Sequence, residues 1–373
     1  MTKALRILGF MTGTSLDAVD MAVIETDGED ILGFGPAGEM KLDPETRAVI
    51  EDAIEDAMEW ERGEYEPESF DDAREAVADA HLSAALSFMA VNGVKARDLD
   101  LVGVHGQTVL HEAPNAERIG RTLQLIDAQA VADELGLPVA YDFRTDDVAA
   151  GGQGAPLAPI YHAALARWSK LQAPVAVLNL GGVGNITLIR SDGALEAFDT
   201  GPANGMIDLL VQARSKARLD VDGALAKAGK VDEAVLAVYL ADPYFAATGP
   251  KSLDRFDFSL EPVAGLSLED AAATLTAFAA QSVALGIARC GEAPTKVVAC
   301  GGGRHNPVLL AAIRDLSGVP VTTAEEEGWR GDSIEAEAFA YLAARTKLGL
   351  PISFPGTTGV AAPLTGGRIA EPA

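Results

Sequence analysis

Two short glycine-rich hairpins, one near the start of each half of the chain, constrain the fold more than any other feature. The first runs from an apolar strand at residues 5–11 through Thr12-Gly13-Thr14-Ser15-Leu16-Asp17 into a second apolar strand that ends at Ile24. The second runs from residues 175–180 through Gly181-Gly182-Val183-Gly184-Asn185 into residues 186–189. Each pattern indicates a strand, a tight turn and another strand. Two hairpins of one design predict a duplicated fold.

The two turns have the composition of anion-binding loops. Glycine lets the backbone approach an anion closely, and turn N–H groups can donate to phosphate oxygens together with the side chains of Thr14, Ser15 or Asn185. Neither turn is a Walker loop, because each leads into a strand and neither contains Gly-Lys-Ser/Thr. One such hairpin is most often only a turn. Two of them predict that a polyphosphate is gripped from both sides.

The charge of the chain limits its partners. The formal net charge is −26, and acidic residues concentrate at 51–68 and 71–79, where they indicate solvated helix faces. Nucleic acid or an anionic membrane would need a basic face, so we expect neither as a partner. We also expect phosphates to be held by backbone N–H groups, helix ends and metal rather than by a lysine cluster.

Cysteine content and the N-terminal residues bear on the compartment. Cys290 and Cys300 are too few for a disulfide framework. A strand begins within five residues of Met1 without a signal-type region, and no apolar run reaches membrane-spanning length. We therefore expect a cytoplasmic protein with reduced thiols. The oligomeric state is open, and a homodimer is one alternative.

Alternating strand and helix patterns predict the α/β class, and 373 residues predict two domains. Further strands are expected at 31–40, 101–104, 139–143 and 296–300, and helices at 44–62, 69–91, 128–135, 159–168, 308–316 and 333–347. We expect residues 1–142 with 349–373 to form the first lobe and 143–348 the second. The sequence Ala-Ala-Gly-Gly-Gln-Gly-Ala-Pro at 149–156 predicts a hinge or an active-site loop between them.

Polar residues at strand ends are candidate site residues. His105 and Gln107 follow the strand at 101–104 and indicate a lining for a hydroxylated substrate. His105 and His111 have no third ligand nearby, so we do not expect a zinc site. Asp199 follows a strand and precedes a turn and a helix, where it is either a helix N-cap or a general base.

Two more segments combine a chemical interpretation with a structural one. Gly301, Gly302 and Gly303 join a strand to a helix, either as a sharp turn or as a side-chain-free surface for adenosine. The acidic run at 142–147 includes Arg144, which belongs either to a surface ion pair or to a site where it orients a substrate oxygen.

These motifs together resemble those of the 1,6-anhydro-N-acetylmuramic acid kinases. They occur in the family's order over nearly the whole chain: MTGTSLDAVD at 11–20, HGQT at 105–108, DFR at 142–144, GGQGAP at 151–156, NLGG at 179–182, FDTGP at 198–202 and CGGG at 300–303. Thr12 stands where the family usually has Ser, and it keeps a hydroxyl. Ala18 stands where the family usually has Gly, so this position must avoid the left-handed region.

The resemblance implies two ribonuclease H-like lobes around a nucleotide cleft, as in the sugar kinase, heat-shock and actin ATPase superfamily. It implies that ATP, Mg²⁺ and water convert 1,6-anhydro-N-acetylmuramic acid to N-acetylmuramic acid 6-phosphate during the recycling of cell-wall peptidoglycan. An inverting glycosidase needs a carboxylic acid and a carboxylate base. Here O6 can leave directly onto the γ-phosphorus, so one base suffices, and the match assigns that role to Asp199.

The resemblance also supplies the remaining site residues, without metal ligands. The nucleotide residues are Gly13, Thr14, Ser15, Leu16, Asp17, Ala18, Val19, Asp20, Gly181, Gly182, Asn185, Gly301, Gly302 and Gly303. The sugar residues are His105, Gln107, Arg144, Asp147 and Glu335. The alternatives are another sugar or carboxylate kinase of this fold and a non-catalytic nucleotide switch. Such a switch would need neither a base at Asp199 nor a polar pocket at 105–108.

Overall fold

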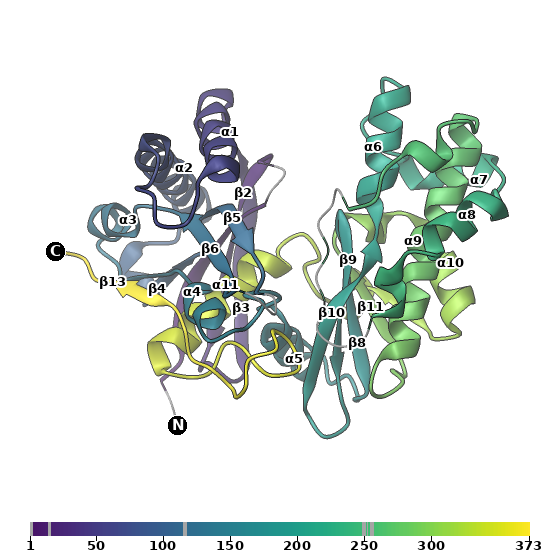
Figure 1. Cartoon of the computed structure of the whole chain (residues 1–373). Helices are drawn as coiled ribbons and strands as arrows, with labels where there is room; N and C mark the ends of the chain where they lie inside the picture. The colour runs from purple at the N-terminus through teal and green to yellow at the C-terminus, as the bar shows by residue number, and fades with distance from the viewer. Residues whose placement is uncertain (1–2, 14–15, 115–117, 248–250, 252, 254–256) are drawn as a thin grey trace. The chain divides into compact units, whose positions relative to one another are not determined.

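The chain folds into two compact units, which Figure 1 shows for the computed structural model. The structure describes residues 3–13, 16–114, 118–247, 251, 253 and 257–373. The first unit comprises residues 1–168 and 333–373, and the second comprises 169–332. Each unit contains a mixed sheet with helices packed on it, so the expected α/β class is confirmed.

The sheet of the first unit has the order β13-β7-β4-β1-β2-β3. Strands β1, β2 and β3 are antiparallel neighbours, β4 and β7 run parallel to β1, and β13 is antiparallel to β7. Their bounds are β1 Leu5–Thr12, β2 Ala18–Thr26, β3 Ile31–Lys41, β4 Leu101–Val104, β7 Val139–Tyr141 and β13 Arg368–Ala370.

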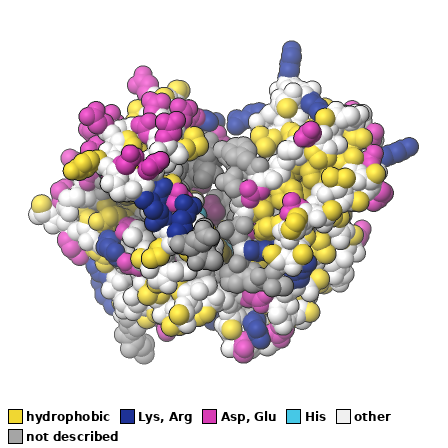
Figure 2. Space-filling view, viewed as in Figure 1, with side chains coloured by type: hydrophobic (Ala, Val, Ile, Leu, Met, Phe, Trp, Pro, Cys, Tyr) yellow, Lys and Arg dark blue, Asp and Glu magenta, His cyan; other side chains and the backbone are white. Residues whose placement is uncertain are grey.

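Helices cover this sheet, and their ends follow ordinary capping rules. The helices are α1 Pro44–Glu59, α2 Glu68–Asn92, α3 Ala128–Leu135, α4 Thr145–Ala149, α5 Pro159–Trp168 and α11 Ile334–Leu348. Asp43 caps α1, and Asp127 caps α3 as the sequence predicts. Figure 2 shows acidic side chains gathered over α1 and α2, as expected for solvated helix faces.

Helix α11 explains why the units differ from the expected lobe boundaries. It packs on β1, β2 and β4, and α5 packs on α11 and β3, so residues 143–168 and 333–348 belong to the first unit. Two strand glycines permit this contact. A Cβ on Gly9 would lie 2.0 Å from the carbonyl oxygen of Ala336, and one on Gly103 would lie 2.4 Å from that of Phe339.

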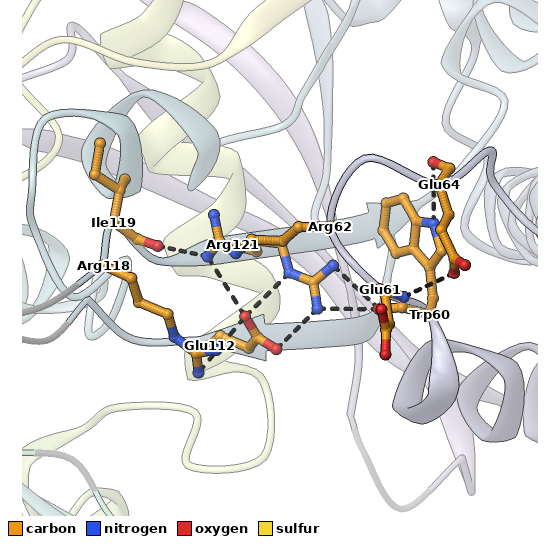
Figure 3. Close-up of polar contacts among 8 residues, drawn as sticks. All are labelled: Trp60, Glu61, Arg62, Glu64, Glu112, Arg118, Ile119 and Arg121. Atoms are coloured by element: carbon orange, nitrogen blue, oxygen red, sulfur yellow. Dashed lines mark hydrogen bonds and ion pairs between the residues drawn. The ribbon is translucent and has the colours of Figure 1, made fainter.

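A separate hairpin of β5 (Gln107–Glu112) and β6 (Arg121–Leu125) is attached to the end of α1 (Figure 3). Arg121 donates to the carbonyl oxygen of Trp60, the C-cap residue of α1, at 3.2 Å, and to the carboxylate of Glu112 at 2.8 and 3.0 Å. Hydrogen bonding by Arg121 lowers the pKa of Glu112, with Arg118 and Arg62 adding to the effect. These three cations lie near the C-terminal end of α1, where positive charge is favourable.

The second unit repeats the strand order of the first, except that it has no counterpart of the edge strand β13 among its described residues. Its sheet has the order β10-β9-β8-β11-β12, with β8, β9 and β10 antiparallel and β11 and β12 parallel to β8. The bounds are β8 Val175–Leu180, β9 Val183–Ile189, β10 Leu195–Pro202, β11 Val297–Cys300 and β12 Val321–Thr323. The duplicated fold predicted from the two hairpins is therefore confirmed, and both sheets have the ribonuclease H-like order.

The helices of the second unit surround the long helix α9. They are α6 Asn204–Arg214, α7 Ala224–Ala228, α8 Glu233–Leu240, α9 Leu268–Arg289 and α10 Pro307–Ser317. Helix α9 packs against α6, α7, α8 and α10. Among the described helices it alone has the length and hydropathy of a membrane span, so the expectation that no apolar run reaches that length is wrong. Of its apolar window 78% is buried, as in a core helix.

Candidate functional site

The first hairpin turn joins β1 to β2 at residues 13–17. Gly13 accepts a hydrogen bond from the backbone N–H of Leu16 at 3.2 Å, and Leu16 has a φ of 53°. Thr14 and Ser15 lie outside the described residues. Ala18 begins β2 without a positive φ, so the alanine fits this position as expected.

The rest of the first motif belongs to the sheet rather than to the turn. Val19 and Asp20 pair with Thr12 and Met11 of β1, and the Val19 side chain is part of the hydrophobic core. Of the described residues of the first motif, Gly13, Leu16 and Asp17 therefore lie between the two strands, with Asp17 exposed.

A buried histidine beneath this turn was not predicted from the sequence. Burial lowers the pKa of His81 to about 4, so the ring is neutral at pH 7. Its Nδ1 lies 2.7 Å from the carbonyl oxygen of Val77 and therefore donates, which leaves Nε2 to accept from the Thr12 hydroxyl at 3.3 Å. The one sequence signal for this position is its helical spacing, since His81 follows the buried Val77 by four residues on α2.

The second turn is held by the beginning of α6. The carbonyl oxygen of Gly181 accepts from the N–H of Asn204, and that of Gly182 accepts from the N–H groups of Ala203 and Gly205. A Cβ on Gly182 would meet no atom of the described chain within 4 Å. Hydrogen bonds from the beginning of α6 therefore hold Gly181 and Gly182, and Gly182 leaves room for a ligand.

The glycine run after β11 lies beside the end of β8, next to the second turn. Gly301 has a φ of 74°, and a Cβ there would lie 2.2 Å from Oδ1 of Asn179. A Cβ on Gly303 would lie 2.7 Å from that of Leu180. A Cβ on Gly302 would meet no atom of the described residues within 4 Å. The structure thus brings together the two glycine motifs of the second unit.

Asp199 lies on the edge strand β10, at a β-bulge that follows it. It is half-buried, and its cross-strand neighbour on β9 is Asn185. Oδ2 accepts from the backbone N–H of Leu253 at 2.9 Å. Burial raises the pKa of Asp199 to about 7, although that hydrogen bond and the charge of Lys251 each lower it. A carboxylate with a pKa near neutrality is suited to general-base catalysis. Asp199 is not the N-cap of α6, because that position is Ala203.

His105 and Arg144 form a directed pair in the first unit. His105 is buried, and its Nδ1 lies 2.8 Å from the carbonyl oxygen of Gly106, so Nδ1 donates. Nε2 then accepts from Nε of Arg144 at 3.0 Å. Burial and Arg144 hold the pKa of His105 well below its usual value. Both ring nitrogens are engaged within the protein, so His105 orients Arg144 instead of presenting a free nitrogen to a substrate.

Arg144 keeps unused donors. Besides His105, its Nη1 donates to the carbonyl oxygen of Gly154 at 2.7 Å. Burial lowers the pKa of Arg144 to about 10, and the carboxylates of Glu335 and Asp147 raise it, so the guanidinium stays charged at neutral pH. Glu335, in the first turn of α11, keeps solvent-exposed surface. The surrounding protein raises the pKa of Glu335, and Arg144 lowers it.

Asp147 anchors the glycine-rich stretch at 149–156. It is 2% exposed; Oδ1 accepts from the N–H of Gly154 and Oδ2 from the hydroxyl of Thr358, both at 2.6 Å. Because the whole stretch lies inside the first unit, the expected hinge between the units is wrong, and the alternative of an active-site loop stays a prediction. The chain passes from one unit to the other at 168–169 and 332–333.

Gln107 is fully buried at the start of β5. Its Nε2 donates to the carbonyl oxygen of Thr108 at 3.2 Å, and its Oε1 has no partner among the described residues. The described part of the chain contains no group of three His, Cys, Asp or Glu side chains that could hold a metal. No disulfide joins Cys290 to Cys300.

Comparison with known proteins identifies the family. Residues 5–372 match the model of the family described as anhydro-N-acetylmuramic acid kinase. The chain is 65% identical over 365 residues to the anhydro-N-acetylmuramic acid kinase of Caulobacter vibrioides, covering 98% of each chain. It is 61% identical over 368 residues to the protein of the same name from Phenylobacterium zucineum, covering 99% of this chain and all of that one.

Proposed function

The chain belongs to the anhydro-N-acetylmuramic acid kinase family, and we propose that it converts 1,6-anhydro-N-acetylmuramic acid, ATP and water to N-acetylmuramic acid 6-phosphate and ADP. This reaction returns a sugar released from peptidoglycan to metabolism. Because ATP is a cytoplasmic cosubstrate, we place the enzyme in the cytoplasm.

The single observation that carries the proposal is Asp199, a half-buried carboxylate whose pKa is raised to about 7. In the proposed reaction, water attacks C1 of the sugar and gives its proton to Asp199. The C1–O6 bond breaks, and O6 forms a bond to the γ-phosphorus as ADP leaves. Phosphoryl transfer thus removes the need for a second, protonated carboxyl group at O6, which an inverting glycosidase would require.

We assign nucleotide binding to the glycine residues of the two turns and of the run after β11, where the backbone carries no side chain. Gly182 in the second turn and Gly302 have open space where a Cβ would stand, as far as the described residues show, which supports phosphate and adenosine binding there. In the first unit the corresponding residues are Gly13–Asp17. Mg²⁺ is expected to arrive with the nucleotide, since it usually keeps several waters and takes few protein ligands. The described side chains offer it no three-ligand group.

The sugar is assigned to polar groups of the first unit. Arg144 has N–H groups beyond its bonds to His105 and Gly154, and Glu335 lies near it with exposed surface. Such a pair can orient the hydroxyl and carboxylate oxygens of an acidic amino sugar. Gln107 offers a buried acceptor that has no partner in the described part of the chain. Asp147 contributes by fixing the loop that supplies the Gly154 carbonyl.

Reaction in ¹⁸O-labelled water tests the coupling of hydrolysis and phosphorylation. We expect one labelled oxygen on C1 of the sugar phosphate and none on the transferred phosphoryl group, measured by mass spectrometry after brief reaction. Unlabelled product incubated in the same water controls for exchange at C1. Label in the phosphate, or no enzymatic label at C1, would exclude the mechanism. Phosphorylation of non-anhydro N-acetylmuramic acid alone would instead indicate an ordinary sugar kinase.

A further inference from the structure

The backbone N–H and C=O groups of Asp199 find their hydrogen-bond partners outside the sheet. β10 is the edge strand, and the bulge after Asp199 interrupts its pairing with β9. A half-buried edge residue leaves backbone N–H and C=O groups that need partners. For Asp199 both partners come from the segment that follows α8, residues 243–253.

Three hydrogen bonds form a closed ring around this residue. The Tyr244 hydroxyl donates to the carbonyl oxygen of Asp199 at 2.6 Å. The N–H of Asp199 donates to the carbonyl oxygen of Lys251 at 3.0 Å. Nζ of Lys251 donates to the carbonyl oxygen of Tyr244 at 3.0 Å and lies 3.9 Å from the centre of the Tyr244 ring. Each of the three residues thus donates to the main chain of the next.

Tyr244 is itself held firmly, so it can define a position. It belongs to a short 3-10 helix, Pro243–Ala246, whose N-cap Asp242 accepts from the Tyr244 N–H at 2.8 Å. Its ring packs edge-on against Phe245, which is buried in the core of the unit. Burial and the neighbouring carboxylates raise the pKa of Tyr244, so its hydroxyl remains a donor throughout the neutral range.

We propose that Tyr244 is a positioning residue for the general base, acting on the main chain of Asp199 and not on the substrate. The proposal rests on the assignment of Asp199 under the proposed function. Its physical reason is that a base must be held within a fraction of an ångström of its productive position, and misplacement by about 1 Å costs on the order of 10²-fold in rate.

Tyr244→Phe tests this by removing one hydroxyl and no ring contact. The matched control is Tyr239→Phe, because the Tyr239 hydroxyl also donates to a backbone carbonyl oxygen of the same unit, that of Ser259, at 2.8 Å. We expect Tyr244→Phe to lower kcat about 10-fold, within the range that such misplacement allows. KM for ATP and for the sugar should change less than about twofold, and melting temperatures of the two variants should be similar.

Two results separate a positioning role from a general loss of structure. Asp199→Asn combined with Tyr244→Phe should be no slower than Asp199→Asn alone, since a residue that acts through Asp199 has nothing left to position. Equal kcat values for the Phe variants of Tyr244 and Tyr239 would overturn the proposal, as would additive losses in the double variant. If Asp199→Asn alone were fully active, the assignment of the base itself would be wrong, a result distinct from failure at Tyr244.

Discussion

The two units use one strand order for different chemistry. After the fourth strand of its sheet in chain order, β4, the first unit continues into His105-Gly106-Gln107, with buried side chains that hydrogen-bond. After the corresponding strand of its own sheet, β11, the second unit continues into Gly301–Gly303, where no side chain is present. The third strands of the two sheets in chain order, β3 and β10, differ as well, because only β10 carries an aspartate with a pKa raised towards neutrality. Duplication thus repeats the framework, and each copy supplies its own chemical groups.

Removal of the carboxylate that distinguishes β10 from β3 should reduce activity the most. Asp199→Asn cannot accept a proton from water, so we expect turnover to fall by at least about 10²-fold while ATP binding is kept. For the unchanged protein, kcat should rise as pH increases through about 7, where Asp199 loses its proton. Steady-state kinetics and ATP titration measure both, and near-normal turnover of the Asn variant would move the role elsewhere.

The same group predicts a pH effect on folding. The pKa of Asp199 is raised in the folded state from 3.8 to about 7, so its favourable contribution is complete below about pH 4 and is lost as pH rises through 7. Asp199→Asn has no such loss. In urea titrations between about pH 4 and 7, the free energy of unfolding of Asp199→Asn should therefore increase relative to that of the unchanged protein. A constant difference across this range would contradict the raised pKa.

A second test concerns the side chains that the first unit places after β4. His105→Leu removes the acceptor for Arg144 and should lower kcat/KM for the sugar about 10-fold, because a buried N–H left unpaired costs about 1–3 kcal/mol. His105→Gln keeps an acceptor and should retain most of the activity. KM for ATP should not change in either variant. A fully active Leu variant would show that Arg144 needs no orientation by His105.

A substitution at Gly302, on the backbone without side chains in the second unit, should have only a small effect on activity. Gly302→Ala meets no described atom, so its melting temperature should be unchanged while KM for ATP rises a few-fold if adenosine lies on this surface. Gly301→Ala is the contrast, because its φ of 74° and its contact with Asn179 predict a stability loss of about 1–3 kcal/mol. An unchanged KM for Gly302→Ala would place adenosine elsewhere.

Much of this organisation could be predicted from the sequence, because hairpins and glycine runs are local patterns. The class, the two turns and the loop after Cys300 follow from such patterns. The hinge prediction failed for a non-local reason. Glycine content at 149–156 indicates conformational freedom, but Asp147 binds Gly154, and Thr358, from more than 200 residues along the chain, binds both Asp147 and Gln153.

Residue roles were harder to predict than residue positions. His105 was placed correctly at a strand end, but its orientation towards Arg144 depends on which ring nitrogen carries the proton, a consequence of the Gly106 carbonyl. Tyr244 and Lys251 belong to no motif, since they act on the main chain of a distant residue. The unit boundary did leave a signal: Gly9 and Gly103, each inside an apolar strand, indicate close packing of another backbone.

The position of α11 has a consequence for synthesis on the ribosome. The first sheet is complete in sequence by residue 141 apart from its edge strand β13, yet the helix that covers β1, β2 and β4 is translated only after the entire second unit. We expect a chain that ends at residue 332 to bind the dye ANS through the uncovered strands, whereas the full chain does not. Nascent chains of this protein would then expose that apolar surface for the time needed to make nearly 200 further residues, a natural point for chaperones to act.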